Sequence, residues 1–319
     1  MEWTDRIGRR LSPRDLHVFL AVIEEGSMAK AATRLAVSRP VVSRAIADLE
    51  QALGVRLLDR APEGVAPTLY GEALLHRARA VFDELRQGVE DLAALTDPNA
   101  ATLRIGSSPV NESGLLPKVI ERLALRYPRM RFVTLTGTVA TRMDALRERR
   151  VDLALARAHA EDPGPDFEFE PLMHERLLVV TAEDSPWAGS TRLADLADAS
   201  WIIAQPEMAE GSPVRAAFAA AGSALPERLI LSDSLSFRLS LLPSGRHVTF
   251  MPDSAVLLAP RPAWLRVLPI ALPRWYLPVV AATLRHRHPT AATELFIAEA
   301  HAVIQEIAVQ DRSMLPRRG

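Results

Sequence analysis

The chain has 319 residues, a formal net charge of −1, 48% hydrophobic and 24% charged residues, and no cysteine. This length predicts two or three domains, and the composition excludes wholesale disorder and fibrous repeats. The absence of cysteine excludes disulfides, thiolate metal sites and a thiol nucleophile. Because the sequence shows no signal segment and no apolar run long enough to cross a bilayer, we expect a cytoplasmic protein without a membrane partner.

Three short helices are predicted near the N-terminus from their capping residues and from apolar residues at helical spacing. Ser followed by Pro is typical of the start of a helix, and Gly of the position just after its end. The first helix begins at Ser12-Pro13 and ends at Gly26, the second covers Met28 to Ala36, and the third begins at Ser38-Arg39-Pro40 and ends at Gly54.

The second and third of these helices, joined by a tight turn at Val37-Ser38, predict a helix-turn-helix over Met28 to Ala47. In that motif the start of the third helix enters the major groove of DNA. The net charge of residues 1 to 60 is only +2, so the case for DNA rests on geometry and not on charge. We interpret Ser38 primarily as a helix cap. The predicted DNA contacts of this helix are Ser38, Arg39, Pro40, Ser43 and Arg44.

The stretch "VRLLDRAPEGVAPT" predicts a two-stranded wing after the helix-turn-helix. Arg56 and Arg60 flank the wing and are placed to contact phosphates. A salt bridge between Arg60 and Glu63 is the alternative for the second arginine.

A long helix is predicted from Thr68 to about Leu95, before "TDPNA" breaks it. Its apolar residues alternate steps of four and three, the spacing of a coiled coil. This pattern predicts that two copies pair, although such a face can also pack on the protein's own core. The residues assigned to dimerisation are Leu74, Val81, Leu85 and Leu92.

From Leu103 onward, strands and helices alternate, which predicts parallel sheets with right-handed crossovers in two lobes. We expect "LRVLPI" and "LPVVAATLR" to be strands that return toward the first lobe, followed by a helix near Thr290 to Gln310. The expected domains are residues 1–67, a linker helix at 68–97, and a C-terminal domain at 98–311. Its first lobe covers about 100–168 and 268–311, and its second lobe about 169–267.

Polar residues follow several of the predicted strands, at the sheet edge where such folds bind ligands. Together they predict a polar cleft between the lobes, with helix N-termini that favour an anionic ligand. Each residue alone is equally well explained as a helix cap. The candidates are Ser107, Ser108, Thr136 and Thr138 in the first lobe, and Gln205, Ser212, Ser234 and Ser236 in the second.

The chain resembles LysR-type transcriptional regulators. The similarity is carried by "DLHVFLAVIEEGSMAKAATRLAVSRPVVSRAIADLEQALGVRLLDR", "GVAPTLYGEALL", "LLPKVIERLALRYP" and "VDLALA". The resemblance implies an α+β multidomain protein with an N-terminal winged helix-turn-helix, a dimerising linker helix and a two-lobed α/β effector domain of the type II periplasmic-binding-protein fold. It also implies promoter DNA, RNA polymerase and a small effector as partners, assembly into a dimer or, as is usual in the family, a homotetramer, and a place at the bacterial nucleoid. We expect the effector to be a sugar, a sugar acid or an aromatic acid.

Two departures from the family pattern stand out. Arg39 occupies a position where the family often has Gln, which affects the base preference of that contact. "LPSGRHVTFMP" replaces a more glycine-rich stretch and, with the opening "MEWTDRIGRRL", resembles the subgroup near the galactose-binding-protein regulator.

Catalytic and metal sites are not predicted. The sequence has no GxSxG elbow, no GxGxxG run and no Walker A run, and "RHRH" at residues 285–288 lacks a third metal ligand and is interpreted as a solvated turn. We therefore expect neither enzymatic activity nor a cofactor. The alternative function is a small-molecule binding protein without DNA activity, which residues 12 to 67 argue against because it would need no helix-turn-helix.

Overall fold

The computed structural model describes residues 11–61, 64–96, 99, 101–157, 164–258, 262–273 and 277–314. The chain divides into two compact units, Met1–Glu90 and Asp91–Gly319, which are described separately. Within the described ranges, no helix has the length and apolar character needed to cross a membrane.

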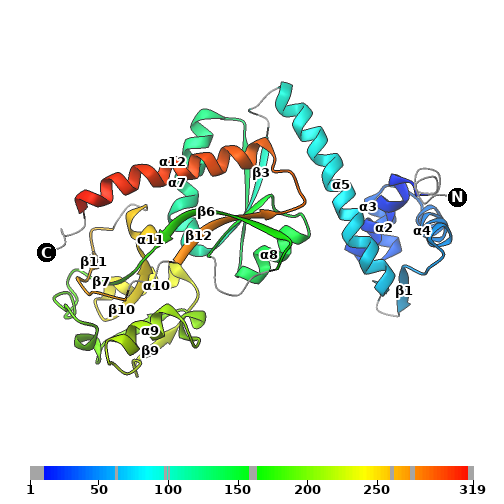
Figure 1. Ribbon diagram of the computed structural model, residues 1–319. Coiled ribbons are helices and arrows are strands. Elements are labelled where there is room, and N and C mark those ends of the chain that lie inside the picture. Colours follow the sequence, from blue (N-terminus) through cyan, green and yellow to red (C-terminus); the bar gives the residue numbers. More distant parts are fainter. Residues whose placement is uncertain are drawn as a thin grey trace. The chain divides into compact units, whose positions relative to one another are not determined.

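The N-terminal unit is built on three helices, which confirm the predicted helix-turn-helix (Figure 1). They are α2 (Pro13–Glu25), α3 (Met28–Arg34) and α4 (Arg39–Leu53). α2 and α4 end, as predicted, at glycines in the left-handed conformation, and their apolar faces share one core with α3. The turn before α4 is made by Ala36, whose φ of 53° is unusual for a residue with a side chain.

The wing consists of two antiparallel strands, β1 (Leu58–Ala61) and β2 (Gly64–Pro67). Its first strand is tied to α4 by Glu50. The carboxylate of Glu50 accepts hydrogen bonds from the backbone N–H groups of Leu57 at 2.7 Å and Leu58 at 3.3 Å. This contact fixes the start of the wing relative to the helix that precedes it.

Helix α5 (Leu69–Thr96) follows the wing and begins against the same core. Gly71 allows this close approach, because a Cβ atom at that position would lie 2.1 Å from the carbonyl oxygen of Leu57. The start of the long helix is thus held by backbone packing that tolerates no side chain.

The first sheet of the C-terminal unit has the strand order β4-β3-β5-β12-β6. β3 runs parallel to β4 and β5, and β12 is antiparallel to β5 and β6, so the sheet is mixed and not purely parallel as predicted. The strands are β3 (Thr102–Ser107), β4 (Arg131–Thr136), β5 (Leu153–Arg157), β6 (Phe167–Glu175) and β12 (Leu277–Leu284).

Helices cover both faces of this sheet. α7 and α12 lie side by side on one face, and α8 packs on the other (Figure 1). Along β5, Leu153 and Leu155 join the core under α7, whereas Ala154 and Ala156 join the core under α8, as the alternation of a strand buried on both faces requires. The helices are α6 (Pro109–Ser113), α7 (Leu115–Arg126), α8 (Val139–Arg147) and α12 (Ala291–Met314).

The second sheet has the order β11-β7-β10-β8-β9 and is also mixed. Trp201 is fully buried beneath it, stacked on Phe250 and edge-on to Phe218. Its strands are β7 (Leu177–Ala182), β8 (Ser200–Ile203), β9 (Leu229–Leu231), β10 (His247–Pro252) and β11 (Leu265–Val267). Its helices are η2 (Leu193–Leu196), η3 (Gln205–Met208), α9 (Pro213–Ala220), α10 (Leu235–Leu241), η4 (Leu242–Ser244) and α11 (Asp253–Leu257).

Two strands differ from the sequence prediction. β11, within "LRVLPI", pairs with β7 of the second sheet and does not return to the first, so only β12 does so. β6 pairs along its whole length with β12, which extends the first lobe to Glu175 and not to about residue 168. Both differences arise because these pairings join segments that lie far apart in the sequence, and the alternation within one strand does not specify its partner.

Candidate functional site

The start of α4 presents polar and cationic side chains to solvent. Ser38, Arg39, Pro40 and Arg44 are exposed, and Ser43 is half-buried. The opposite face of the helix holds it on the core through Val42, Ala45, Ile46 and Leu49. The order of apolar residues therefore decides that this polar end faces outward.

Arg39 and Arg44 make no salt bridge or side-chain hydrogen bond among the described residues, whereas the nearby Arg34 pairs with Glu24 at 2.7 Å and Glu25 at 3.3 Å. The capping bond expected of Ser38 is absent as well. Ser38 stands at the N-cap of α4 with extended backbone angles, but its hydroxyl accepts nothing from the helix. The hydroxyl of Ser38 and the guanidinium groups of Arg39 and Arg44 can thus donate hydrogen bonds to another molecule.

Arg56 lies at the base of the wing, and its side chain is exposed. Its backbone carbonyl accepts a hydrogen bond from the hydroxyl of Thr68 at 2.7 Å. The backbone of Arg60 pairs with Val65 across the hairpin. The Arg60 side chain and Glu63 fall outside the described residues, so the choice between a phosphate contact and a salt bridge stays a prediction.

Helix α5 leaves the core of its own unit part-way along its length. Leu74 packs against that core and Ala78 is 1% exposed, so this part of the predicted coiled-coil seam contacts the same chain. Further along, large apolar side chains are exposed at helical spacing. This α5 apolar face consists of Val81, Leu85, Val89 and Leu92, three of which are among the residues predicted for dimerisation.

In the first lobe, the structure brings the predicted cleft residues to one sheet edge. Ser107 and Thr136 are register partners at the ends of β3 and β4. Ser107 is fully buried, and its hydroxyl donates only a long 3.5 Å bond to the carbonyl of Ser108. Thr136 donates to the carboxylate of Glu112 at 2.5 Å. Ser108 and Thr138 are N-caps of α6 and α8, so for these two the capping role is observed.

In the second lobe, the four candidates also cap or brace short helices. The backbone N–H of Gln205 donates to Asp233 at 2.9 Å, which connects the segments that follow the parallel strands β8 and β9. Ser212 caps α9, Ser234 caps α10, and the hydroxyl of Ser236 lies 3.0 Å from that of Ser234. No hydrogen bond within the described ranges joins these residues to the four of the first lobe.

Arg142 of α8 is a residue of the first-lobe edge that the sequence analysis missed. It is 3% exposed, and its Nε and Nη1 atoms are buried without a hydrogen-bond partner. Burial and the neighbouring charge of Arg157 lower its pKa to about 10, against an opposite effect of Glu112. A guanidinium with that pKa is still charged at neutral pH. Helical spacing gave no sign of it, because a single arginine on an amphipathic helix is usually solvated.

The connection between β6 and β7, where the chain passes from the first sheet to the second, carries buried ion pairs. Glu175, at the end of β6, accepts from Arg157 at 2.8 Å and from the hydroxyl of Ser254. The next residue, Arg176, pairs with Asp253 at 2.8 Å, and burial raises the pKa of that carboxyl above its usual range. Asp253 and Ser254, at the start of α11 between β10 and β11, therefore hold the Glu175–Arg176 junction where the chain passes from the first sheet to the second.

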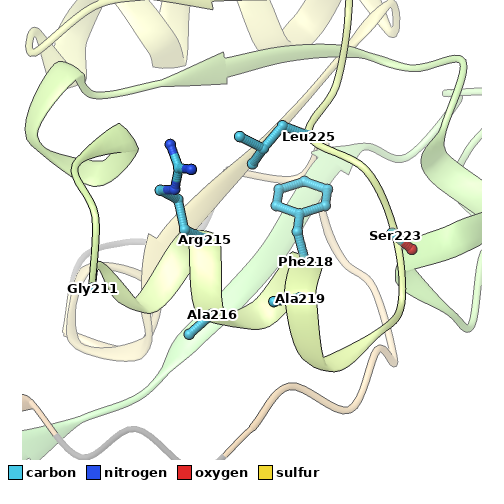
Figure 2. Close-up of a pocket in the computed structure, with 7 residues that line it drawn as sticks. All are labelled: Gly211, Arg215, Ala216, Phe218, Ala219, Ser223 and Leu225. Atoms are coloured by element: carbon cyan, nitrogen blue, oxygen red, sulfur yellow. The ribbon is translucent and has the colours of Figure 1, made fainter.

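A pocket of about 340 Å³ lies elsewhere, on the second lobe (Figure 2). Arg215 and Phe218 of α9 and Leu225 line it, and the Arg215 guanidinium donates to the carbonyl of Met208 at 3.3 Å. None of the eight predicted effector residues lines this pocket, so it is distinct from the predicted site.

"RHRH" has a structural explanation. Arg287 is not solvated as predicted: it is 6% exposed and pairs with Asp152 at 2.8 Å. Across the described ranges, no group of three or more histidine, cysteine or acidic side chains is arranged to hold a metal ion.

Comparison with known proteins identifies the two units. Residues 13–72 match the family model described as "Bacterial regulatory helix-turn-helix protein, lysR family", and residues 96–305 match "LysR substrate binding domain". The chain belongs to the LysR family of bacterial transcriptional regulators. It is therefore a DNA-binding regulator with an effector-binding C-terminal domain. The family matches support this function over the alternative of a small-molecule binding protein without DNA activity.

LysR-type relatives and structures resemble the chain over most of its length. The regulator GbpR of Azospirillum brasilense is 29% identical over 75% of this chain and 71% of its own, in line with the subgroup expected. A full-length OxyR variant from Pseudomonas aeruginosa has a TM-score of 0.68 at 24% identity, covering 91% of this chain and 94% of its own. Full-length CbnR, solved with its target DNA, has a TM-score of 0.64 at 22% identity, covering 92% and 99%. These structures support the fold.

Proposed function

We propose that this LysR-type regulator reads promoter DNA with the start of α4, and that a small molecule held between its two lobes controls it. The observation that carries the proposal is the pair Arg39 and Arg44, exposed and without an ion-pair partner within the described residues. Cations at the start of a recognition helix are placed to enter the major groove.

The chemistry of Arg39 sets the expected base preference. A guanidinium donates two parallel hydrogen bonds to O6 and N7 of guanine, whereas the glutamine often found at this position pairs best with adenine. We therefore propose that Arg39 selects guanine. The free hydroxyl of Ser38 is a further donor to base or phosphate, and Arg56 contacts phosphate from the wing.

The test is to select the preferred duplex from a random library and to measure its affinity by fluorescence anisotropy at fixed salt. Arg39→Ala and Arg44→Ala should each weaken binding about tenfold or more, since a good base contact is worth about 1 to 3 kcal/mol. Arg34→Ala is the matched control, because Arg34 is already paired with Glu24 and Glu25. Unchanged affinity in both α4 variants would refute the groove assignment.

Control by an effector is tested in the same assay. Ser107→Ala removes a buried hydroxyl whose present hydrogen bond is weak, so we expect loss of the ligand response while DNA binding without ligand survives. Retention of both properties would place the effector elsewhere.

The remaining parts of the proposal concern assembly and location. We propose that α5 pairs with the α5 of a second copy, that two dimers form a tetramer, and that the regulator acts at the cytoplasmic nucleoid together with RNA polymerase. Regulation by binding alone requires no catalytic step, and we propose none.

A further inference from the structure

The guanidinium of Arg142 lies at the sheet edge that carries the predicted effector residues. A Cβ atom at Gly106, next to Ser107 in β3, would stand 3.4 Å from the Cβ and Cγ atoms of Arg142, so the side chain crosses β3 at its last residues. Its charged end interacts with Arg157, the last residue of β5, and with Glu112 of α6. All three neighbours stand at or just beyond the carboxyl ends of the parallel strands.

The neighbouring acidic side chains do not form an ion pair with the guanidinium of Arg142 within the described residues. Glu175 is already bound by Arg157 and by Ser254. Glu112 accepts the hydroxyl of Thr136 and makes no ion pair with Arg142 in the part of the chain that the structure describes. A buried cation without hydrogen bonds is costly to fold, and proteins tolerate such groups mainly where a ligand supplies the partner.

We propose that Arg142 is the residue that binds the anionic group of the effector, a carboxylate or a phosphate. The proposal rests on the proposed effector cleft and names the chemistry that the cleft recognises. The anion would lie against the Nε and Nη1 atoms of Arg142 at the carboxyl ends of the strands, and Arg157 would add positive potential. A planar guanidinium holds either anion by two parallel hydrogen bonds.

The first test needs no ligand. Arg142→Met should raise the midpoint of thermal unfolding of the ligand-free protein by about 2 °C or more, because it removes an unpaired buried charge and keeps an apolar stem. Arg287→Met is the matched control. Arg287 is equally buried but paired with Asp152, so its loss should lower the midpoint. A fall of similar size in both variants would mean that Arg142 is a structural residue, and would overturn the proposal.

The second test uses anions and their uncharged counterparts at equal ionic strength: acetate with acetamide, benzoate with benzamide, and inorganic phosphate with sodium chloride as reference. At least one anion should raise the midpoint of thermal unfolding of the wild-type protein where its counterpart does not. The Arg142→Met substitution should weaken the binding of that anion at least tenfold. Stabilisation by the carboxylates alone or by phosphate alone identifies the source of the charge. The proposal is wrong if no anion exceeds its counterpart, or if the variant binds the anion as tightly as the wild type.

The third test separates this inference from the proposed function. DNA binding is measured with the anions of the second test and with neutral glucose and galactose. If a neutral sugar changes DNA binding equally in the wild type and in Arg142→Met, the cleft function stands and the anion assignment fails. If neither class changes DNA binding of the wild type, effector control itself fails, and this inference fails with it.

Discussion

Leu85, on the α5 apolar face, provides a quantitative test of self-association. Complete burial of a leucine side chain is worth about 1.5 to 3 kcal/mol, and Leu85 is 54% exposed in the single chain, so a partner helix that covers it gains about 1 kcal/mol in each copy. Leu85→Asp loses this gain and also desolvates a carboxylate, at a cost of several kcal/mol when the charge is buried unpaired.

Because both copies carry the change, we expect Leu85→Asp to weaken the dimer by at least about 4 kcal/mol, or roughly a thousandfold in Kd. Leu85→Ala removes only apolar contact and should weaken it roughly tenfold. Sedimentation velocity over a range of concentrations measures both effects. The control is Ala73→Asp, which adds the same charge at an exposed position of α5 outside the apolar face.

The result that would refute this reasoning is an unchanged mass at low micromolar concentration for Leu85→Asp with a normal circular dichroism spectrum. It would mean that α5 does not pair through this face. Dissociation of Ala73→Asp to the same extent would also refute the reasoning, since charge alone would then explain the effect.

Two further predictions concern stability. Gly71→Ala should lower the free energy of unfolding by about 1 to 3 kcal/mol in urea titrations, since its Cβ atom would meet the carbonyl oxygen of Leu57, while Gly88→Ala on the same helix has open space and should raise it by up to about 1 kcal/mol. Equal effects would contradict the packing at Gly71. Burial and the nearby Arg246 lower the pKa of His247, so folded protein binds its proton less readily and stability should be lost as the pH falls through about 6.5. His247→Gln should lose less stability than the wild type between pH 7.5 and 5.5; an equal loss would contradict this prediction.

The helix-turn-helix could be predicted because its signals are local. Pro13 and Pro40 in the first turns and glycines in the left-handed conformation after the ends mark α2 and α4, and the apolar spacing of each helix defines its buried face. The same reasoning misjudged Ser38, because the sequence shows a residue able to cap but not whether its hydroxyl does so.

The sheet neighbours and the buried charges could not be read from the sequence. Whether β6 and β11 belong to the first or the second sheet depends on pairing between distant segments, and each strand has the same alternation in either place. Arg142 and Arg287 are both arginines in charged surroundings of the sequence. Only the fold shows that Arg287 is buried with an ion-pair partner, whereas Arg142 is buried without one.

The hydrogen bonds from Leu57 and Leu58 to Glu50 have a consequence for how this regulator fits DNA. They join the wing to the C-terminal half of α4, so one carboxylate helps to fix the distance between the wing and the arginines that we propose to enter the groove. A domain clamped in this way cannot stretch to follow a groove of different width. A duplex that deviates from the required groove width must deform to be bound, and its stiffness then contributes to which promoters are selected.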